Sequence, residues 1–375
     1  MRSVQDFEGM DTVERMLVHK AYARRIPVNG SLELLPLCNM NCDMCYVRLS
    51  KEEMDQKGRL RTKDEWLDLA KQMKDAGTLF LLITGGEPLL FPEFKQLYKE
   101  LQNMGMILTI NTNGTLLNEE WADFFAKHKP RRVNITLYGA DDQAYEELCN
   151  YKGGFDQTIC AIKLLRDRDI DVKINGSITT KNENDIKKIL EIAATLDAVA
   201  NLDTYMYPAI RERNKPFHEQ SRMNPKEAAM ARARILKNQW GKEAFESYTR
   251  SVIDTVEHYI PENYGYDRHI SCLAGNCSFT INWQGMMRPC VMQSVPQANV
   301  FEEGFVQSWK KISSQTDDIL INEACVICKY RSICNTCAAA ALLETGDYEG
   351  IPEYICEYTK EFYNILKEGD NNARQ

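Results

Sequence analysis

The chain has 375 residues, 44% of them hydrophobic, which is enough to bury a sizeable core and to form two or three domains. Its net charge of -8 and its pI near 5.4 argue against a nucleic-acid partner or an acidic membrane partner, because no dense Lys and Arg tract is present. Residues 1–8 lack the pattern of a signal peptide, and no run of about eighteen apolar residues occurs. We therefore expect a cytoplasmic protein whose 13 cysteines are metal ligands or small buried hydrophobes rather than disulfides.

The N-terminal segment, residues 1–29, is predicted to be helical, with an amphipathic helix around Asp11 to Arg25 that packs as a lid on the domain that follows. A turn at 26–30 leads into the apolar run Leu32–Leu35, which we interpret as the first strand of a core.

Three thiols follow this strand. Cys38, Cys42 and Cys45 are separated by three and by two residues, so a tight loop can turn their sulfurs toward one point. Three thiolates leave one iron of a four-iron cluster without a protein ligand. The alternatives are a zinc loop and three buried thiols. A closed structural zinc site needs a fourth ligand, and no Cys or His lies near this trio in the sequence.

Strand and helix patterns then alternate. A helix over 63–76 is predicted from Thr62 as its N-cap and Glu65 as the partner in a capping box. The strand-like segments are Leu79–Thr84, Ile107–Ile110, Val133–Leu137, Val172–Asn175 and, more weakly, Ala200–Tyr207. The helical patterns between them lie near 92–103, 118–127, 141–148, 156–167 and 184–196. This order indicates βαβ units and a parallel sheet, but periodicity alone does not separate an open barrel from a doubly wound sheet.

Polar residues and glycines follow the predicted strands. Loops at the carboxyl ends of barrel strands form active sites, so these residues should share one mouth with the thiol loop. They are Gly85, Gly86 and Glu87 after the second strand, Thr112 and Asn113 after the third, Thr136 at the end of the fourth and Ser177 near the fifth. Ordinary turn chemistry is the alternative for each residue after the third and fourth strands.

The amino-acid composition changes in the second half of the chain. Residues 208–264 are polar and helical, with 224–227 opening an Ala-rich helix, and we interpret them as a bridge. Residues 265–360 are rich in cysteine, and 361–375 are a polar C-terminal tail. Eight thiols in one segment fit two closed four-iron clusters. Zinc binding by the two CxxC pairs is the alternative, although a longer loop usually separates the two CxxC pairs of a zinc site. These thiols are Cys272, Cys277, Cys290, Cys325, Cys328, Cys334, Cys337 and Cys356.

The thiol loop after the first strand, the Gly-Gly-Glu loop after the second and the C-terminal cysteine pattern, including Gly285 before Cys290, resemble the radical S-adenosylmethionine (SAM) enzymes that carry a SPASM extension. The resemblance covers residues 30–360. It implies a partial (β/α)6 TIM-like barrel over 30–207, the helical bridge, and a small α+β auxiliary-cluster domain over 265–360. One departure is visible, because the last close pair of cysteines is separated by two residues where that family usually has three.

The resemblance implies three 4Fe-4S clusters and SAM as cofactors. Cys38, Cys42 and Cys45 would hold the SAM-binding cluster. The first auxiliary cluster would take Cys272, Cys277, Cys290 and Cys337, and the second would take Cys325, Cys328, Cys334 and Cys356. Cys149 and Cys160 are left over, and we expect both to be buried hydrophobes on helices.

The resemblance also implies contacts to SAM. Gly85, Gly86 and Glu87 would hold its amino group, and Thr112 and Asn113 would meet its ribose and carboxylate. Thr136 stands where the family commonly has a serine that serves SAM, and Ser177 would edge the adenine. The basic residue that often pairs the SAM carboxylate has no counterpart in the stretch 158–161. Candidates for a general base, by position alone, are Tyr138, Tyr205, Tyr207, Arg211 and His218.

The activity that the resemblance implies is reductive cleavage of SAM, abstraction of a substrate hydrogen by the 5′-deoxyadenosyl radical, and net oxidation with the auxiliary clusters as an electron sink. The leading hypothesis is modification of a ribosomally made peptide by a cross-link such as a thioether, or by dehydrogenation. The implied partners are a flavodoxin-type or ferredoxin-type electron donor and a separate protein that recognises the leader peptide, because residues 1–25 look too short for that task.

Three alternatives stay open. The first is an anaerobic sulfatase-maturing enzyme that forms formylglycine; Val291 counts against it, because that branch commonly has Asp after the corresponding cysteine. The second is an oxidase of a small molecule or of a porphyrin side chain. The third is a non-catalytic iron-sulfur electron carrier or regulator, in which the Gly-Gly-Glu loop and an open iron would have no use.

Overall fold

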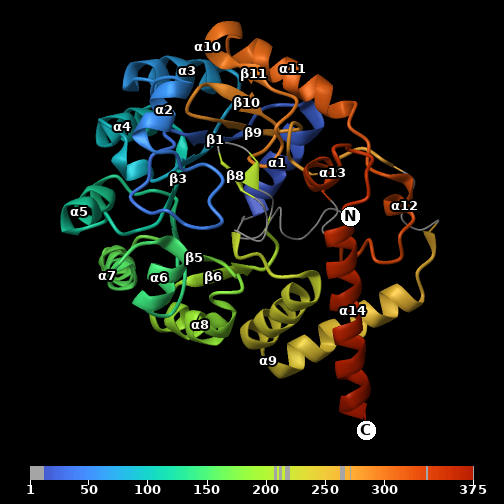
Figure 1. The fold of residues 1–375 in the computed structure, drawn as a ribbon. Helices are drawn as coiled ribbons and strands as arrows, with labels where there is room; N and C mark the ends of the chain where they lie inside the picture. The colour runs from blue at the N-terminus through green and yellow to red at the C-terminus, as the bar shows by residue number, and fades with distance from the viewer. Residues whose placement is uncertain are drawn as a thin grey trace.

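Six parallel strands form the centre of the fold in the computed structural model, which describes residues 12–206, 209–210, 213–215, 220–261, 267–270, 272–334 and 337–374. Each strand pairs with the next one along the chain, and together they belong to a nine-stranded sheet (Figure 1). The six strands are β1 (Asn29–Glu33), β2 (Phe80–Thr84), β3 (Ile107–Thr112), β4 (Arg132–Thr136), β5 (Val172–Ser177) and β6 (Val199–Asp203).

Helices follow these strands and lie along the outside of the curved sheet (Figure 1). They are α2 (Lys51–Lys57), α3 (Lys63–Asp75), α4 (Phe94–Asn103), α5 (Glu119–Lys127), α6 (Asp142–Cys149), α7 (Gly154–Arg166) and α8 (Ile186–Thr195). The capping box predicted for α3 is present, with Thr62 and Glu65 bonding reciprocally. The predicted α/β class and the partial barrel of six units are confirmed.

The start of β1 differs from the prediction. The turn expected at 26–30 gives way to strand from Asn29 onward, and β1 ends at Glu33 rather than at Leu35. Gly30 lies between two neighbouring strands, where an added Cβ would come within 2.5 Å of the Phe279 ring. The glycine that predicts a turn therefore allows close packing inside a strand.

The sheet continues into the cysteine-rich part of the chain. β9 (Ser278–Ile281) pairs parallel with β1, and β10 (Met286–Arg288) and β11 (Ala298–Asn299) follow it as antiparallel strands. Short helices complete this region: α10 (Val300–Glu303), α11 (Phe305–Asp317), α12 (Glu323–Val326) and α13 (Ala338–Thr345). The boundary expected between 264 and 265 stays a prediction, and one sheet joins the two sides.

Two long helices pack against each other beside the barrel. α9 (Pro225–Glu257) is kinked at Gly241, whose φ of 78° lies in the left-handed region, and α14 (Glu353–Arg374) runs along it (Figure 1). The expected C-terminal tail is wrong, because α14 continues through 361–374. Its buried side chains Tyr358, Phe362 and Leu366 recur at helical spacing. Most residues between them are polar, so this apolar stripe is hard to recognise in the sequence. A short hairpin of β7 (Ala209–Ile210) and β8 (Asn214–Lys215) precedes α9.

The N-terminal helix α1 (Thr12–Arg24) covers the amino-terminal ends of the strands. Its Val18 and Ala21 pack in an apolar cluster with Val28 and Phe80, at the start of β1 and β2. The predicted role as a packing lid is therefore confirmed, at the end of the barrel opposite the loops that carry the candidate site. Within the described ranges, the structure contains no helix that is both long and apolar enough to cross a lipid bilayer.

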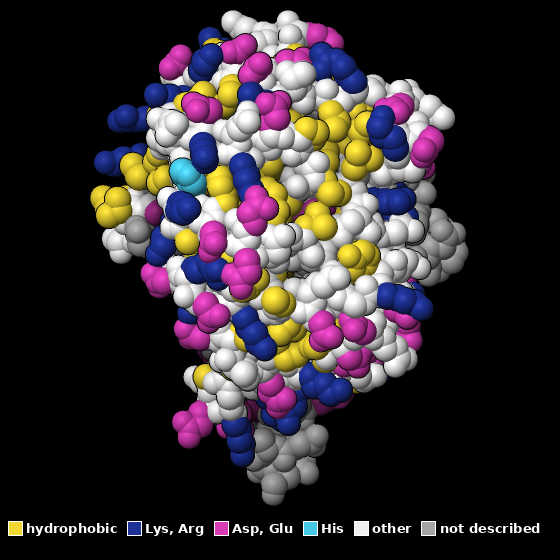
Figure 2. All heavy atoms as spheres, turned by 90° about the vertical axis from the view of Figure 1, so that its left-hand side faces the viewer, with side chains coloured by type: hydrophobic (Ala, Val, Ile, Leu, Met, Phe, Trp, Pro, Cys, Tyr) yellow, Lys and Arg dark blue, Asp and Glu magenta, His cyan; other side chains and the backbone are white. Residues whose placement is uncertain are grey.

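The outer face shown in Figure 2 carries basic and acidic side chains side by side, with hydrophobic patches between them. Ion pairs of this kind join neighbouring helices and loops, as in Lys95–Glu120 at 2.5 Å and Lys129–Asp169 at 2.9 Å.

Candidate functional site

The loop that carries Cys38, Cys42 and Cys45 follows β1 and is fastened to the end of α6. The Asn41 amide donates to the Cys149 carbonyl at 2.9 Å, and the Asp43 amide donates to the Leu148 carbonyl at 3.0 Å. These bonds use two carbonyls at the carboxyl end of α6, which lack partners inside the helix. The thiol loop is therefore held by backbone contacts on both sides of Cys42.

The loop after β2 packs directly on the chain that leads into the thiol loop. The amides of Gly86 and Glu87 donate to the carbonyls of Leu35 and Leu37 at 2.7 and 2.9 Å. A Cβ at Gly85 would lie 2.5 Å from the Leu35 oxygen, and one at Gly86 would lie 2.2 Å from the Leu37 oxygen. Both glycines are needed so that the two backbones can touch.

Glu87 ties this loop to the end of β3. Its side chain is fully buried, and its carboxylate accepts hydrogen bonds from the Thr112 hydroxyl at 2.8 Å, the Asn113 amide at 2.9 Å and the Leu89 amide at 3.0 Å. A carboxylate has about four acceptor positions, so three of them are already used. In this structure Glu87 thus positions the β2 and β3 loops relative to each other; its predicted contact with the SAM amino group stays a prediction.

Burial raises the pKa of Glu87 from 4.5 to about 7. In the unfolded chain the group ionises near 4.5, so its contribution to stability is complete below that pH and is lost as pH rises through 7. We expect the free energy of unfolding of the wild type to fall by about 2–3 kcal/mol more than that of Glu87→Gln between pH 5 and pH 8. Anaerobic urea denaturation of both proteins at each pH measures this difference. Parallel pH profiles would contradict it.

The end of β3 reaches the thiol loop. The Asn113 side-chain amide donates to the Asn39 side-chain oxygen at 2.9 Å and lies 3.7 Å from the Cys38 sulfur. Asn39 in turn donates to the Thr115 hydroxyl at 2.8 Å. Asn113 therefore reaches the thiol loop, and Thr112 is joined to that region through its bond to Glu87, whereas Asn39 and Thr115 were not predicted as site residues. Asn39 directly follows Cys38 in the sequence, and Thr115 lies two residues after Asn113. This closeness to predicted site residues is the sequence signal that could have identified them.

Thr136 and Ser177 lie at the same end of the sheet, one and two strands further on, where β4 and β5 end. Their predicted contacts with SAM stay predictions. Among the candidate bases, Tyr138 lies near Cys42, and its pKa is well above the ordinary value, first because the ring is buried and then because of the charge of Cys42. Tyr205 donates to Glu344 at 3.1 Å. Tyr207, Arg211 and His218 lie outside the described residues.

The three thiols of the loop lie close enough to influence one another. Burial raises the pKa of Cys38 to about 12, and the charges of Glu87, Cys42 and Cys45 add to this effect. Burial and then Cys42 raise the pKa of Cys45. The pKa of Cys42 is lowered, first because Cys149 hydrogen-bonds to its sulfur. One basic residue from the β7–β8 hairpin also reaches the loop: the Arg213 guanidinium donates to the Cys42 carbonyl at 3.3 Å.

The donor set fits an iron-sulfur cluster by its chemistry and its grouping. Thiolates are the protein ligands of such clusters, and each binds a different iron of the cube. The ligand sulfurs of a four-iron cluster are therefore further apart than those of a single zinc ion. Around one zinc ion, two sulfurs lie about 3.8 Å apart, because each Zn–S bond is about 2.3 Å. Over the part of the chain that the structure describes, no three Cys, His, Asp or Glu side chains are placed to hold a single metal ion.

The eight C-terminal cysteines were predicted as two sets of cluster ligands, and the structure brings the thiols of one set near one another. Burial and then the charges of Cys356, Cys334 and Cys328 raise the pKa of Cys325, so these four thiols lie near one another. They are the set predicted for the second auxiliary cluster.

Each of the other four cysteines has a different neighbour in the structure. Cys277 is buried beside the N-terminal helix, Cys290 lies near Tyr348, Cys337 lies near Tyr205, and Cys272 accepts a hydrogen bond at its carbonyl from Asn276. Their assignment to one cluster stays a prediction.

The two remaining cysteines differ from each other. Cys149 is buried as predicted, but Cys160 is exposed, so the prediction for Cys160 is wrong. On α7 the buried side chains include Thr158, Ala161, Ile162 and Leu165, and Cys160 lies outside that stripe. The carbonyl of Cys149 accepts a hydrogen bond from the Asn41 amide of the thiol loop, a contact that no local signal in the sequence indicates.

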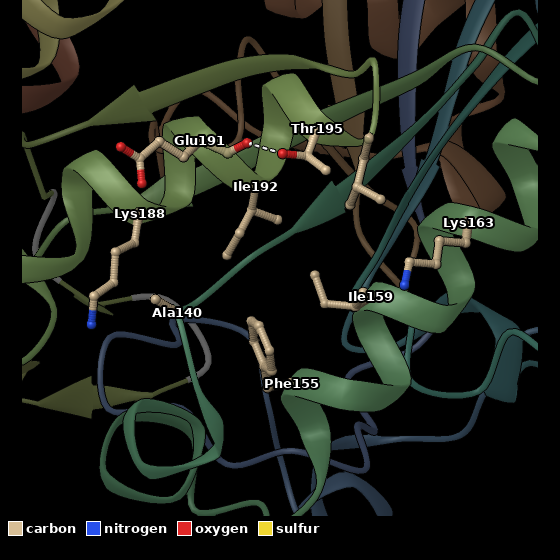
Figure 3. Close-up of a pocket in the computed structure, with 9 residues that line it drawn as sticks. Ala140, Phe155, Ile159, Lys163, Lys188, Glu191, Ile192 and Thr195 are labelled. Carbon is tan, nitrogen blue, oxygen red and sulfur yellow. Dashed lines mark hydrogen bonds between the residues drawn. The ribbon is translucent and has the colours of Figure 1, made fainter.

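A surface cavity of about 370 Å³ between α7 and α8 lies apart from all of these residues. Figure 3 shows Phe155 and Ile159 of α7 facing Ile192 of α8 across it, with Lys163 and Lys188 toward its two sides. A second cavity of about 560 Å³ lies between the residues that follow α1, the end of α3 and α11. Neither cavity is lined by a predicted site residue.

Comparisons with known proteins agree with this geometry. Residues 32–193 match the Radical SAM superfamily. The AdoMet-dependent heme synthase of Methanosarcina barkeri is 26% identical, over 84% of this chain and 92% of that protein. The PqqA peptide cyclase of Bradyrhizobium diazoefficiens is 23% identical, over 93% of this chain and 90% of that protein. The crystal structure of Streptococcus suis SuiB superposes with a TM-score of 0.66 at 18% identity, over 92% of this chain and 81% of that one.

Proposed function

We propose that this chain, a radical SAM enzyme whose radical SAM domain covers residues 32–193, oxidatively modifies a peptide during ribosomal peptide maturation. The observation that carries the oxidative part is the grouping of Cys325, Cys328, Cys334 and Cys356 in a domain that shares a sheet with the barrel. A closed Cys₄ cluster there would accept the electron left on an oxidised substrate.

The roles of the residues follow from their contacts. Cys38, Cys42 and Cys45 would hold a 4Fe-4S cluster, which together with bound SAM supplies a 5′-deoxyadenosyl radical. The backbone of Gly85 and Gly86 lies against the thiol loop and would present its polar groups to the methionine part of SAM. Glu87 would keep that surface in register with Thr112 and Asn113 at the end of β3.

Thr136 and Ser177, at the ends of β4 and β5, would contact the ribose and adenine parts of SAM from the same mouth. Cys272, Cys277, Cys290 and Cys337 would complete a first auxiliary cluster, for a total of three 4Fe-4S clusters. A flavodoxin or ferredoxin would supply electrons, and a separate protein would recognise the leader peptide.

Two kinds of relative bear on the substrate. The PqqA peptide cyclase acts on a peptide by its name, and SuiB has been solved bound to the precursor peptide SuiA, which supports a peptide substrate. The heme synthase of M. barkeri is matched over 92% of its length, so oxidation of a porphyrin side chain is the second candidate. Formylglycine formation is less favoured, because Val291 stands where an acidic residue is expected.

The substrate class is tested with the reconstituted, reduced enzyme and SAM under argon. One arm contains a Cys-containing precursor peptide, and the other contains a carboxylate-bearing porphyrin precursor of haem. We expect the peptide to lose two hydrogens, about 2 Da by mass spectrometry, in an amount that tracks 5′-deoxyadenosine. Turnover in the porphyrin arm alone would replace the peptide proposal with the second candidate.

The number of clusters gives an independent prediction. We expect about twelve irons per chain in the wild type and about eight in the double variant Cys325→Ala/Cys334→Ala, because that variant loses one four-iron cluster. Anaerobic iron and sulfide analysis measures both proteins, and Cys160→Ala serves as a control that keeps all clusters. About four irons together with bound zinc in the wild type would contradict the auxiliary-cluster assignment.

A further inference from the structure

Asn113, directly after β3, is buried and held by hydrogen bonds on several sides. Its backbone amide donates to Glu87 at 2.9 Å, and its carbonyl accepts a hydrogen bond from the Thr158 hydroxyl at 3.2 Å. Its side-chain oxygen accepts hydrogen bonds from the amide and the hydroxyl of Thr115, at 2.9 and 2.7 Å. Its side-chain nitrogen donates to the Asn39 oxygen at 2.9 Å. The side chain cannot rotate without losing several of these bonds.

The same bonds fix which way the side-chain amide of Asn113 points. The backbone amide of Thr115 can only donate, so the Asn113 atom that faces it is the oxygen. The nitrogen therefore points toward the thiol loop. One of its two N–H bonds is used by Asn39, whose own side-chain nitrogen donates to the Thr115 hydroxyl at 2.8 Å. The other N–H bond is left for the Cys38 sulfur, which lies 3.7 Å from the nitrogen.

The Cys38 sulfur thus has two N–H donors, one from the backbone and one from a side chain. The Met40 amide donates to it at 3.4 Å, and Asn113 is the second donor. A substitution can remove the second donor but not the first, because the first belongs to the backbone.

Such a donor acts on a bound cluster through the charge of its sulfur ligand. A cysteine sulfur bound to iron is a thiolate and can only accept a hydrogen bond. Hydrogen bonds to cluster sulfurs are one of the factors that set the reduction potential of an iron-sulfur cluster. A donor stabilises the reduced cluster more than the oxidised one, because the reduced cluster carries more negative charge on its sulfurs.

We propose that Asn113 is a positioning residue that raises the reduction potential of the cluster held by Cys38, Cys42 and Cys45, by donating a hydrogen bond to the Cys38 sulfur. This inference rests on the proposed function, since it needs a cluster on the three thiols. The role differs from the predicted contact of Asn113 with SAM, because the polar atoms of its side chain are already engaged by Thr115, Asn39 and Cys38.

The test is an anaerobic redox titration of the cluster signals by electron paramagnetic resonance (EPR), without SAM, in reconstituted wild type and Asn113→Leu. Leucine is similar in size to asparagine and has no donor. The signal of the cluster in question is the one that Cys38→Ala lacks. At the wild-type midpoint, we expect the ratio of reduced to oxidised cluster to fall about threefold or more in Asn113→Leu, which corresponds to about 28 mV at about 59 mV per factor of ten.

Asn103→Leu is the matched control. Asn103 is exposed at the end of α4, before β3 begins at Ile107, whereas Asn113 follows the last residue of that strand. The same substitution is thus made beyond the opposite end of β3, and the midpoint should equal that of the wild type. If Asn113→Leu does not fold or does not keep its iron, Asn113→Ala replaces it, because alanine also lacks a donor and needs less room.

Two results would overturn the inference. The first is an unchanged midpoint in Asn113→Leu with full iron content. The second is an unchanged midpoint together with a weaker response of the signal to added SAM, which would make Asn113 a SAM contact instead. The expected shift in a cluster that does not respond to SAM would support the inference and contradict the proposed function, so the two failures are distinguishable.

Discussion

Replacing any one of Cys38, Cys42 and Cys45 by alanine is expected to reduce the formation of 5′-deoxyadenosine from SAM by at least roughly a thousandfold. The reason is that the trio offers only three thiols to a four-iron cluster, so the loss of one leaves two irons without protein ligands. The iron content should fall by about four per chain while the auxiliary clusters remain. Reduced protein, SAM and dithionite are incubated under argon, and the product is measured by liquid chromatography.

Cys160→Ala is the matched control for this prediction, because it removes an exposed thiol that contacts none of the candidate ligands named above. Its activity and iron content should equal those of the wild type. Full 5′-deoxyadenosine formation by a trio variant would show that SAM cleavage occurs elsewhere or needs no cluster at this loop.

Replacing Gly86 by alanine is expected to destabilise the protein by about 2–3 kcal/mol and to abolish measurable SAM binding. The added Cβ would lie 2.2 Å from the carbonyl oxygen of Leu37, which is backbone and cannot rotate away. The loop after β2 must then move off the chain that leads to the thiol loop. Equilibrium urea denaturation measures the stability, and equilibrium dialysis with labelled SAM measures the binding.

Gly369→Ala is the control for this change. Gly369 lies in α14, and an added Cβ there meets no heavy atom within 4 Å. Because alanine favours the helix, we expect this variant to be more stable by about 0.5–1 kcal/mol and to bind SAM as the wild type does. Wild-type SAM affinity in Gly86→Ala would contradict the role given to the contact between the two loops.

Local signals in the sequence predicted most of the barrel. The capping box of Thr62 and Glu65 defined the start of α3, and the apolar run before Gly85 defined β2, because both depend on neighbours in the chain. The parallel order of β1 to β6 followed from the alternation of strands and helices. The position of the site at the carboxyl ends of these strands followed in turn.

Other features depend on contacts between distant segments and could not be predicted. Gly30 looks like a turn residue, and only the approach of Phe279 from β9 shows why a strand needs glycine there. Cys149 and Cys160 are the same residue type on neighbouring helices, and only the packing of each helix decides which one is buried. The hydrogen bond from the Asn41 amide to the Cys149 carbonyl joins segments more than a hundred residues apart.

The central claim is that Cys38, Cys42 and Cys45 hold a four-iron cluster whose fourth iron is free to bind SAM. Electron-nuclear double resonance on the reduced wild-type enzyme, with SAM labelled by ¹⁵N in the amino group and ¹⁷O in the carboxylate, tests it most directly. We predict that one cluster signal changes when SAM is added and shows coupling to both labels. Signals that are the same with and without SAM, and that carry no coupling, would contradict the claim.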